Sequence, residues 1–348
     1  MKKVVYILGA GFSAFAELPV MANFIDKAKD IYFSNSEYKY NKEIKQALDL
    51  IREYAVIKNT MNSNLLNIEE LLSIYDMKQF VSPSENKSIM QTFIKAVISY
   101  YQDNFFSGFK INDSDPRIMA SNEFHDLYTT WLLLMFGIET TGHLCYMVGA
   151  ENKFISKIEK FSKSCDYGIV TFNYDTIIET ITKAIEERVN CRDIELLSTE
   201  NFAKNSIRYC KLHGSINRDT IIPPTWAKTQ FPDVKKDWED AFTLLKSANE
   251  IRIIGFSFPE TDSHVSYLFK SAIIDNENLK KIDVICMDNN DYVKNKYLNK
   301  FCTEKLRFKN KNISDYLGYI YNYKKNNRVN YSDDELEYIH EVFFNTED

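Results

Sequence analysis

The sequence predicts an α/β protein built on a doubly wound parallel sheet, with a large helical insertion and a helical C-terminal tail. Short unalternating apolar runs are typical of strands buried on both faces, and helix-like segments separate several of them. The chain has 348 residues, of which 45% are hydrophobic and 14% aromatic, which is enough for a sizeable core. It has only 10 Gly and 7 Pro, which argues against a turn-rich all-β fold.

The first predicted strand is Lys3–Leu8, an apolar run that ends in Gly9-Ala10-Gly11. Lys2-Lys3 at its start and Ala14-Phe15-Ala16 after it imitate a signal peptide. We favour a buried strand that enters a glycine turn. No other apolar run approaches the roughly 20 residues that cross a bilayer, so we expect no membrane segment.

Residues 19–149 are predicted to be helical, because apolar side chains recur at helical spacing in 67–72 and 124–147. That region shows no strand-like run of comparable strength. We therefore expect a helical insertion over 24–149, between the first strand and the rest of the core.

Strands and helices then alternate, which predicts a parallel sheet. We assign the core to 1–23 plus 150–310 and a helical C-terminal extension to 311–348. A capping box at Ser332-Asp333-Asp334-Glu335 starts a final helix that runs to about Phe344. The predicted strands are Tyr167–Phe172, Ser206–Leu212, Glu250–Gly255 and Lys281–Met287, and the predicted helices are Thr176–Arg188, Trp238–Ala248 and His264–Ala272.

Charge and cysteine usage argue against several classes of function. The 43 Lys and Arg against 49 Asp and Glu give a net charge of -6, which counts against a general nucleic-acid binder. The basic stretches 305–313 and 323–328 are better interpreted as a solvated face. The six cysteines are scattered without a CxxC pair, so we expect no metal site, and reduced thiols in a cytoplasmic protein.

Polar or glycine-containing clusters follow the predicted strands, at the sheet edge where open α/β sheets bind ligands. The first fits G-x-G-x-x-G/A, whose glycines let the backbone approach a pyrophosphate, although a tight turn without ligand is the alternative. A dehydrogenase is disfavoured, because Asp26 falls in an apparent helix rather than at a strand end. The clusters are Gly9-Ala10-Gly11-Phe12-Ser13-Ala14, Thr171-Phe172-Asn173-Tyr174-Asp175, His213-Gly214-Ser215 and Gly255-Phe256-Ser257.

Each cluster also has a structural interpretation. Asn173 and Asp175 can cap the helix that follows them. A lone His such as His213 is more often structural than catalytic. The joint placement of the clusters is what favours a single site.

In this order, GAGFSAFAELP, TFNYDT, KLHGSIN and IIGFSF resemble sirtuins, and more closely the sirtuin-like proteins of bacterial antiphage defence. NIEELL, IIPPTW and GFSFPETDSH look similar to the same branch. The resemblance covers about residues 1–25 and 165–295 and implies a Rossmann-like core that binds NAD. The zinc-binding cysteine pairs of true sirtuins are missing, and Val20-Met21-Ala22 stands where sirtuins have a motif ending in arginine. Both departures disfavour protein deacylation.

The resemblance also implies roles for individual residues. Asn173 and Asp175 would face the nicotinamide and its ribose, and His213 would be the general base. The glycine turn would cradle the phosphates, and the later strand ends would line the adenosine side. The implied NAD-binding residues are Gly9, Ala10, Gly11, Phe12, Ser13, Thr171, Gly214, Gly255, Ser257 and Asn289.

The branch without the sirtuin zinc module is known for hydrolysing NAD. We therefore expect an NAD glycohydrolase that depletes cellular NAD as an antiphage effector, with NAD as substrate and no metal. A catalytically quiet module that binds NAD or ADP-ribose and regulates a partner ATPase is the alternative, and an NAD-dependent protein deacylase is a weaker third. The resemblance further implies a homo-oligomer and a phage-derived trigger.

Overall fold

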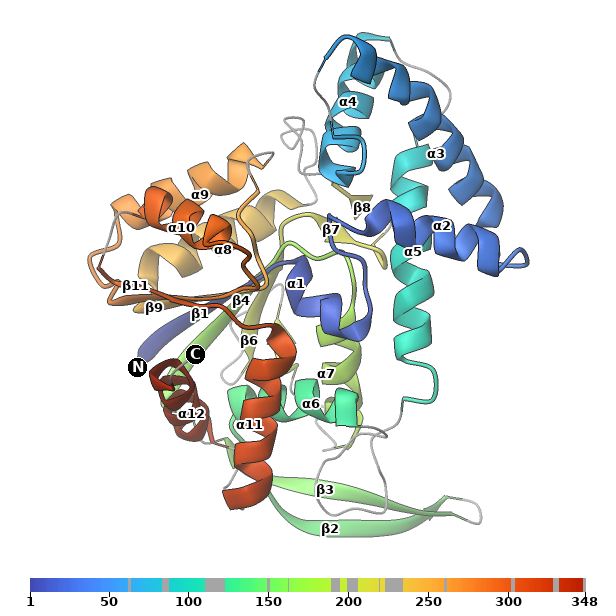
Figure 1. Cartoon of the computed structure of the whole chain (residues 1–348). Helices are drawn as coiled ribbons and strands as arrows, with labels where there is room; N and C mark the ends of the chain where they lie inside the picture. The colour runs from blue at the N-terminus through green and yellow to red at the C-terminus, as the bar shows by residue number, and fades with distance from the viewer. Residues whose placement is uncertain are drawn as a thin grey trace.

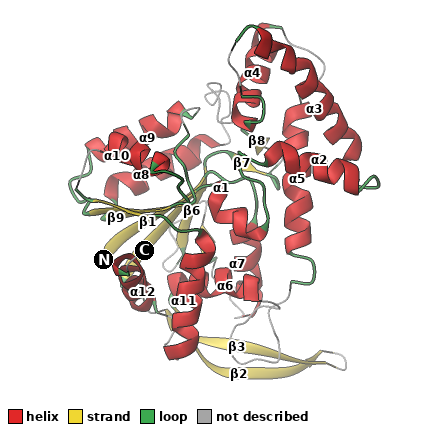
Figure 2. Cartoon of the chain, viewed as in Figure 1, coloured by secondary structure: helices red, strands yellow, loops and turns green. Residues whose placement is uncertain are grey.

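The computed structural model describes residues 1–61, 64–82, 88–109, 123–148, 151–161, 163–188, 195–198, 206–218, 220–222, 234–259, 262–301, 304–327 and 332–346. A seven-stranded parallel sheet lies at the centre, with helices on both of its faces (Figure 1; Figure 2). The doubly wound α/β fold is therefore confirmed. None of the described helices combines the length and the hydropathy that crossing a membrane requires.

The strand order of the sheet places a reversal of chain direction beside its first strand. The order is β11-β10-β9-β1-β4-β6-β5, and all of the pairings are parallel. The chain starts in the middle, builds outward to one side, and then returns to lay β9 against the other side of β1. Ligands of open α/β sheets bind beside such a switch point. The strands are β1 (Lys2–Leu8), β4 (Cys165–Thr171), β5 (Leu197–Ser198), β6 (Ile207–Lys211), β9 (Glu250–Ile254), β10 (Lys281–Ile285) and β11 (Leu306–Lys309).

Side chains of β1 alternate between two separate cores. Val4, Tyr6 and Leu8 belong to the core that includes α6, α7, α11 and α12. Val5 and Ile7 belong to the core with α8, α9 and α10. A strand buried on both faces has no solvent side, which explains its unbroken apolar sequence. These helices are α6 (Glu123–Phe136), α7 (Ile177–Arg188), α8 (Lys235–Ser247), α9 (Ser263–Ile274), α10 (Tyr292–Phe301), α11 (Ile313–Asn327) and α12 (Asp333–Asn345).

The five strands and the helices predicted between them are confirmed, as is the final helix. The prediction of a continuous helix over 124–147 is wrong, because α6 ends at Phe136 and β2 (Ile138–Val148) pairs antiparallel with β3 (Glu151–Phe161). Gly137 has a φ of +61° and ends the helix. The rest of the insertion is helical where described: α2 (Phe24–Ser34), α3 (Asn41–Tyr54), α4 (Ile68–Val81) and α5 (Ile89–Phe105).

The division into core, insertion and C-terminal extension stays a prediction. In the structure, α11 and α12 pack against α6 and help to cover one face of the sheet. These last two helices therefore contribute directly to the packing of the sheet.

Buried charged groups tie α12 to the sheet. Arg252 on β9 is 1% exposed and donates to Glu337 on α12 at 2.7 Å and to the Tyr6 hydroxyl at 2.8 Å. Burial favours the neutral acid, but Arg252 and Lys2 outweigh it and lower the pKa of Glu337 to about 2. The carboxylate of Glu337 is thus held ionised inside the protein, where it balances the buried positive charge of Arg252.

His340 on α12 is buried in a neutral form. Its Nε2 lies 2.9 Å from Asp283 Oδ2, and its Nδ1 lies 2.9 Å from the Tyr316 hydroxyl. A neutral imidazole satisfies both contacts, by donating from Nε2 and accepting at Nδ1. Burial, with the nearby Arg252 guanidinium, lowers the pKa of His340 to about 4.

We expect His340 to make the fold sensitive to acid. Its pKa is about 4 when folded against 6.5 ordinarily, so between these values the unfolded chain binds a proton that the folded protein does not. The stabilising contribution is complete above the ordinary pKa and is lost as pH falls toward the folded one, by at most about 3 kcal/mol. Urea unfolding across this pH range measures it. The decline should be shallower in His340→Gln, and an equal decline in both proteins contradicts the prediction.

Candidate functional site

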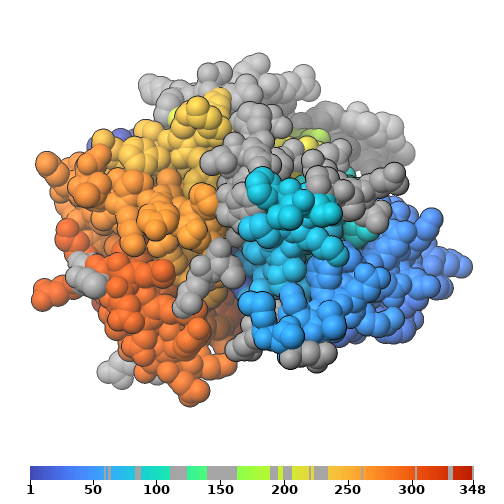
Figure 3. All heavy atoms as spheres, turned by 90° about the horizontal axis from the view of Figure 1, so that it is seen from above, coloured from blue at the N-terminus to red at the C-terminus, as the bar shows by residue number. Residues whose placement is uncertain are grey.

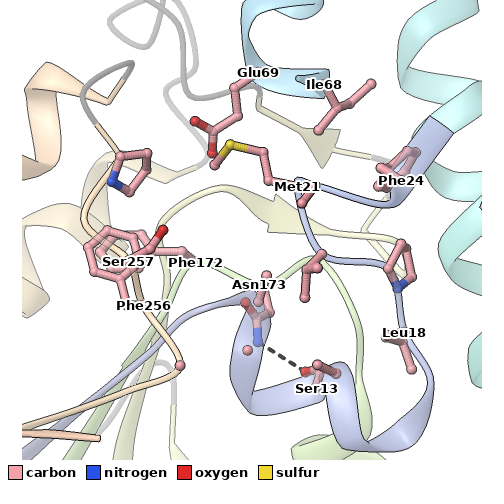
Figure 4. A pocket seen from close by; sticks show the side chains of 18 of the residues that line it. Ser13, Leu18, Met21, Phe24, Ile68, Glu69, Phe172, Asn173, Phe256 and Ser257 are labelled. Carbon is pink, nitrogen blue, oxygen red and sulfur yellow. Dashed lines mark hydrogen bonds between the residues drawn. The ribbon is translucent and has the colours of Figure 1, made fainter. Parts of the chain in front are cut away.

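A cavity of about 980 Å³ lies at the carboxyl edge of the sheet, beside the switch point between β1 and β9. Its floor is formed by the turns that follow the strands. Its roof comes from the segment that follows α1 (Ala10–Ser13) and from parts of α4 and α5 in the insertion (Figure 4). From above, the insertion, in blue to cyan, stands beside the core residues in yellow and orange (Figure 3).

Two glycine turns pack against each other at the floor. The Gly9 N–H donates to the Ile254 carbonyl at 3.0 Å, and the Gly11 N–H donates to the Gly255 carbonyl at 2.8 Å. A Cβ on Gly9 would lie 2.6 Å from the Gly255 oxygen, and one on Gly255 would lie 2.2 Å from the Phe12 nitrogen. Only glycines allow this approach. The prediction that the first turn also cradles phosphates stays a prediction.

Asn173, Ser13 and Asp175 form a continuous hydrogen-bonded chain. Asn173 Nδ2 donates to the Gly9 carbonyl at 2.9 Å and to Ser13 Oγ at 3.0 Å, as drawn in Figure 4 for the latter. Ser13 Oγ donates to Asp175 Oδ2 at 2.6 Å. Because a carbonyl only accepts, the orientation of the Asn173 amide is fixed. Its Oδ1 is left as the acceptor on a residue that lines the cavity.

Lys211 is a buried cation that contacts the Asp175 end of this hydrogen-bonded chain. It is 1% exposed, and its Nζ donates to the Asp175 carbonyl and, at 2.9 Å, to Glu179 Oε1. Burial raises the pKa of Asp175, while Lys211 and the Ser13 hydroxyl partly offset that rise. The sequence analysis did not select Lys211, although this lysine begins the KLHGSIN motif at a predicted strand end.

His213 lies in the turn after β6 and pairs with Asp262. Its Nε2 is 2.9 Å from Asp262 Oδ2, and its ring centre is 5.3 Å from that of Phe172. Asp262 precedes α9, and its Oδ1 accepts from the Val265 N–H at 3.3 Å. Sequence analysis did not select Asp262, whose signal was an acidic residue just ahead of a predicted helix.

The cavity gathers most of the predicted site residues. Those that line it are Ala10, Gly11, Ser13, Asn173, Asp175, His213, Gly255 and Ser257. Five others lie outside the lining, each with another contact or position. Gly9 and Thr171 position Asn173: the Gly9 carbonyl accepts from its side-chain amide, and Thr171 Oγ1 accepts from its N–H at 3.1 Å. Phe12 is buried against Tyr128 and Trp131. Gly214 begins β7 (Gly214–Ser215), and Asn289 is exposed.

The two sides of the cavity differ in chemistry. The floor presents a carboxamide, a hydroxyl, a carboxylate and an imidazole. The roof contributes the apolar side chains of Met21, Phe24 and Ile68, together with the carboxyl group of Glu69 (Figure 4). Such a cavity suits a ligand that carries both hydroxyl groups and a flat apolar ring.

A group of potential metal ligands lies on α12 and β10 instead. Asp283, His340 and Glu341 place ligand atoms within 4.8 Å of one another. Arg307 donates to both Asp283 oxygens at 2.7 Å and to Glu341 at 3.0 Å. A guanidinium thus already occupies these carboxylates, and the expectation of no metal stays a prediction.

Residues 168–311 match the family model of the SIR2-like domain. The predicted resemblance to sirtuins is confirmed for this SIR2-like segment, which contains Asn173, Asp175 and His213. No curated protein is similar enough to the chain to match it. A crystal structure of Sir2 with an inhibitor, 2'-O-acetyl-ADP-ribose and a deacetylated p53 peptide aligns over 94% of each chain at 12% identity, with a TM-score of 0.25. The fold class rests on the strand order described above.

We expect Gly255→Ala to destabilise the protein by more than about 2 kcal/mol, because a Cβ there meets backbone and the residue has a positive φ. Gly318→Ala is the matched control. Gly318 lies within α11 with open space around it, so alanine should stabilise that helix by up to about 1 kcal/mol. Chemical denaturation measures both changes. Equal stability of Gly255→Ala and the wild type contradicts the packing argument.

Proposed function

We propose that this chain is an NAD glycohydrolase, which uses water to cleave the bond between nicotinamide and ribose and releases nicotinamide and ADP-ribose. One observation carries the proposal: Asn173, Asp175 and His213 of the SIR2-like segment line one cavity at the switch point of the sheet. The apolar roof offers a surface for a flat ring, and the polar floor offers partners for ribose hydroxyls.

The reaction needs more help at the sugar than at the leaving group. When the bond breaks, its electron pair goes to nicotinamide, which leaves as a neutral molecule. The ribose carbon becomes an oxocarbenium-like cation, to which water adds with loss of a proton. The residues of the site therefore have to stabilise positive charge, hold the water and accept the proton.

Each of the three residues suits one of these tasks. Asn173 has a fixed amide whose Oδ1 can accept from a ribose hydroxyl or from the water. Asp175, when ionised, offsets positive charge that develops above the floor. His213 accepts the proton, a contribution typically worth about 10²–10⁴ in rate.

From the resemblance to antiphage proteins, we further propose that the activity depletes cellular NAD during infection and that self-association controls it. Light scattering on the purified chain tests self-association. A monomer at all accessible concentrations contradicts that part of the proposal and leaves the reaction untouched.

Incubation of the purified protein with NAD should release free nicotinamide and ADP-ribose. His213→Ala and Asn173→Ala should each lower the rate by about 10²-fold or more while keeping the fold, because each removes one of the tasks above. Product analysis, with a thermal melt of each variant, measures both. NAD binding without release of nicotinamide supports the quiet binding module instead. A full rate in His213→Ala contradicts its role as base.

A further inference from the structure

We propose that Asp262 is the positioning residue for His213: its carboxylate fixes the tautomer of the imidazole and stabilises the positive charge that the ring acquires. The catalytic part of this inference rests on the proposed function. The part that concerns the ring itself does not, because the tautomer and pKa of His213 are properties of the protein without substrate.

The geometry indicates which nitrogen of the His213 ring carries the hydrogen in the neutral form. His213 Nε2 and Asp262 Oδ2 are 2.9 Å apart, and the two side chains are only 6% and 2% exposed. An ionised carboxylate can only accept, so Nε2 carries the hydrogen. Nδ1 is then the nitrogen with the lone pair, and it is the base atom of the neutral ring. The negative charge of this carboxylate next to the ring also stabilises the protonated form of the imidazole.

The two oxygens of Asp262 have different partners. Oδ1 accepts from the Val265 N–H in the first turn of α9, and Oδ2 faces the imidazole. The apolar side chains of α9 that follow, including Val265 and Phe269, are buried in the core on one face of the sheet. The carboxylate is therefore held by a helix that cannot shift without disturbing that core.

The imidazole is anchored just as firmly from its own side. The carbonyl of His213 accepts from the Ile222 N–H at 2.9 Å, and the rings of Phe172 and Tyr174 lie 5.3 Å and 6.0 Å from the imidazole centre. The contact joins two segments that are 49 residues apart in the chain. It brings the end of β6 and the start of α9 together at the cavity.

Other groups on the cavity wall also act on the charge of the ring. Burial raises the pKa of Tyr174 well above its ordinary value and that of Cys286 to about 12, so both stay neutral near pH 7. Negative carboxylates favour the imidazolium and a lysine opposes it. The effect of Asp262 is therefore measured as the change in the His213 pKa between the wild type and an Asp262 variant. The titratable or charged groups concerned are Glu69, Tyr174, Asp175, Asp262, Cys286 and Lys311.

A helix cap alone would also fix the position of this carboxylate, so the test must separate the two roles. Asp262→Ser does so, because serine is a good N-cap but has no charge for the ring. Asp275→Asn is the matched control. Asp275 stands at the other end of α9 and is exposed, and it pairs only with Lys246 among the described ion pairs.

The first experiment follows His213 by nitrogen NMR in the protein without NAD. The chain has 5 His, and the His213 signals are those lost in His213→Gln. We expect the tautomer protonated at Nε2 in the wild type, and a pKa lower by about one unit or more in Asp262→Ser. Asp275→Asn should leave both unchanged. An unaltered pKa and tautomer in Asp262→Ser overturn the proposal, whether or not NAD is hydrolysed.

The second experiment measures NAD hydrolysis against pH. Asp262→Ser should lower kcat by about 10²-fold, with little change in KM, and should move the basic group of the pH profile to lower pH. The thermal melt of the variant should stay close to that of the wild type. A full rate with an unchanged profile overturns the catalytic part. A shifted His213 pKa in a protein that never releases nicotinamide supports the pairing and contradicts the proposed reaction.

Discussion

The close approach of two glycine turns, Gly9-Ala10-Gly11 and Gly255, is the constraint on which the site depends. These turns end β1 and β9, the strands on either side of the switch point. Because no Cβ separates them, the Gly9 carbonyl comes within reach of Asn173, and Ser13 comes within reach of Asp175. A shift of one turn would therefore change the orientation of the carboxamide as well as the packing of the sheet.

Buried charge is used differently on the two sides of this constraint. Near α12, Arg252 and Glu337 neutralise each other inside the core, and His340 is kept neutral. In the cavity, Asp175 and His213 sit in a wall that a ligand can reach. Desolvation acts on both groups of residues. In the cavity, by contrast, the polar atoms of these described residues face an open space that can hold a ligand.

The sequence predicts the floor of the site better than its supports. Asn173, Asp175 and His213 could be predicted from the sequence because parallel strands end at one edge, so that polar residues after separate strands converge there. Lys211 and Asp262 could not, because ion pairs between segments far apart in the chain leave no periodic pattern in the sequence. Asn289 follows β10, is exposed and lies outside the cavity lining, so its role stays a prediction; a strand end does not fix which way its loop turns. The strand β2 was missed because the apolar residues of 124–147 recur at helical spacing.

The place of the insertion follows from the topology. A chain that leaves the carboxyl end of β1 has to return to the amino end of β4, so any addition between them begins at the edge where the site lies. The segment after the glycine turn, which includes Met21, and the first elements of the insertion, which include Phe24, consequently form the roof. A rearrangement of α4 or α5 would alter the cavity directly, because both helices supply lining side chains. Because the crossover between β1 and β4 covers the cavity, a ligand or partner that moved the insertion would also change the shape of the cavity above its polar floor.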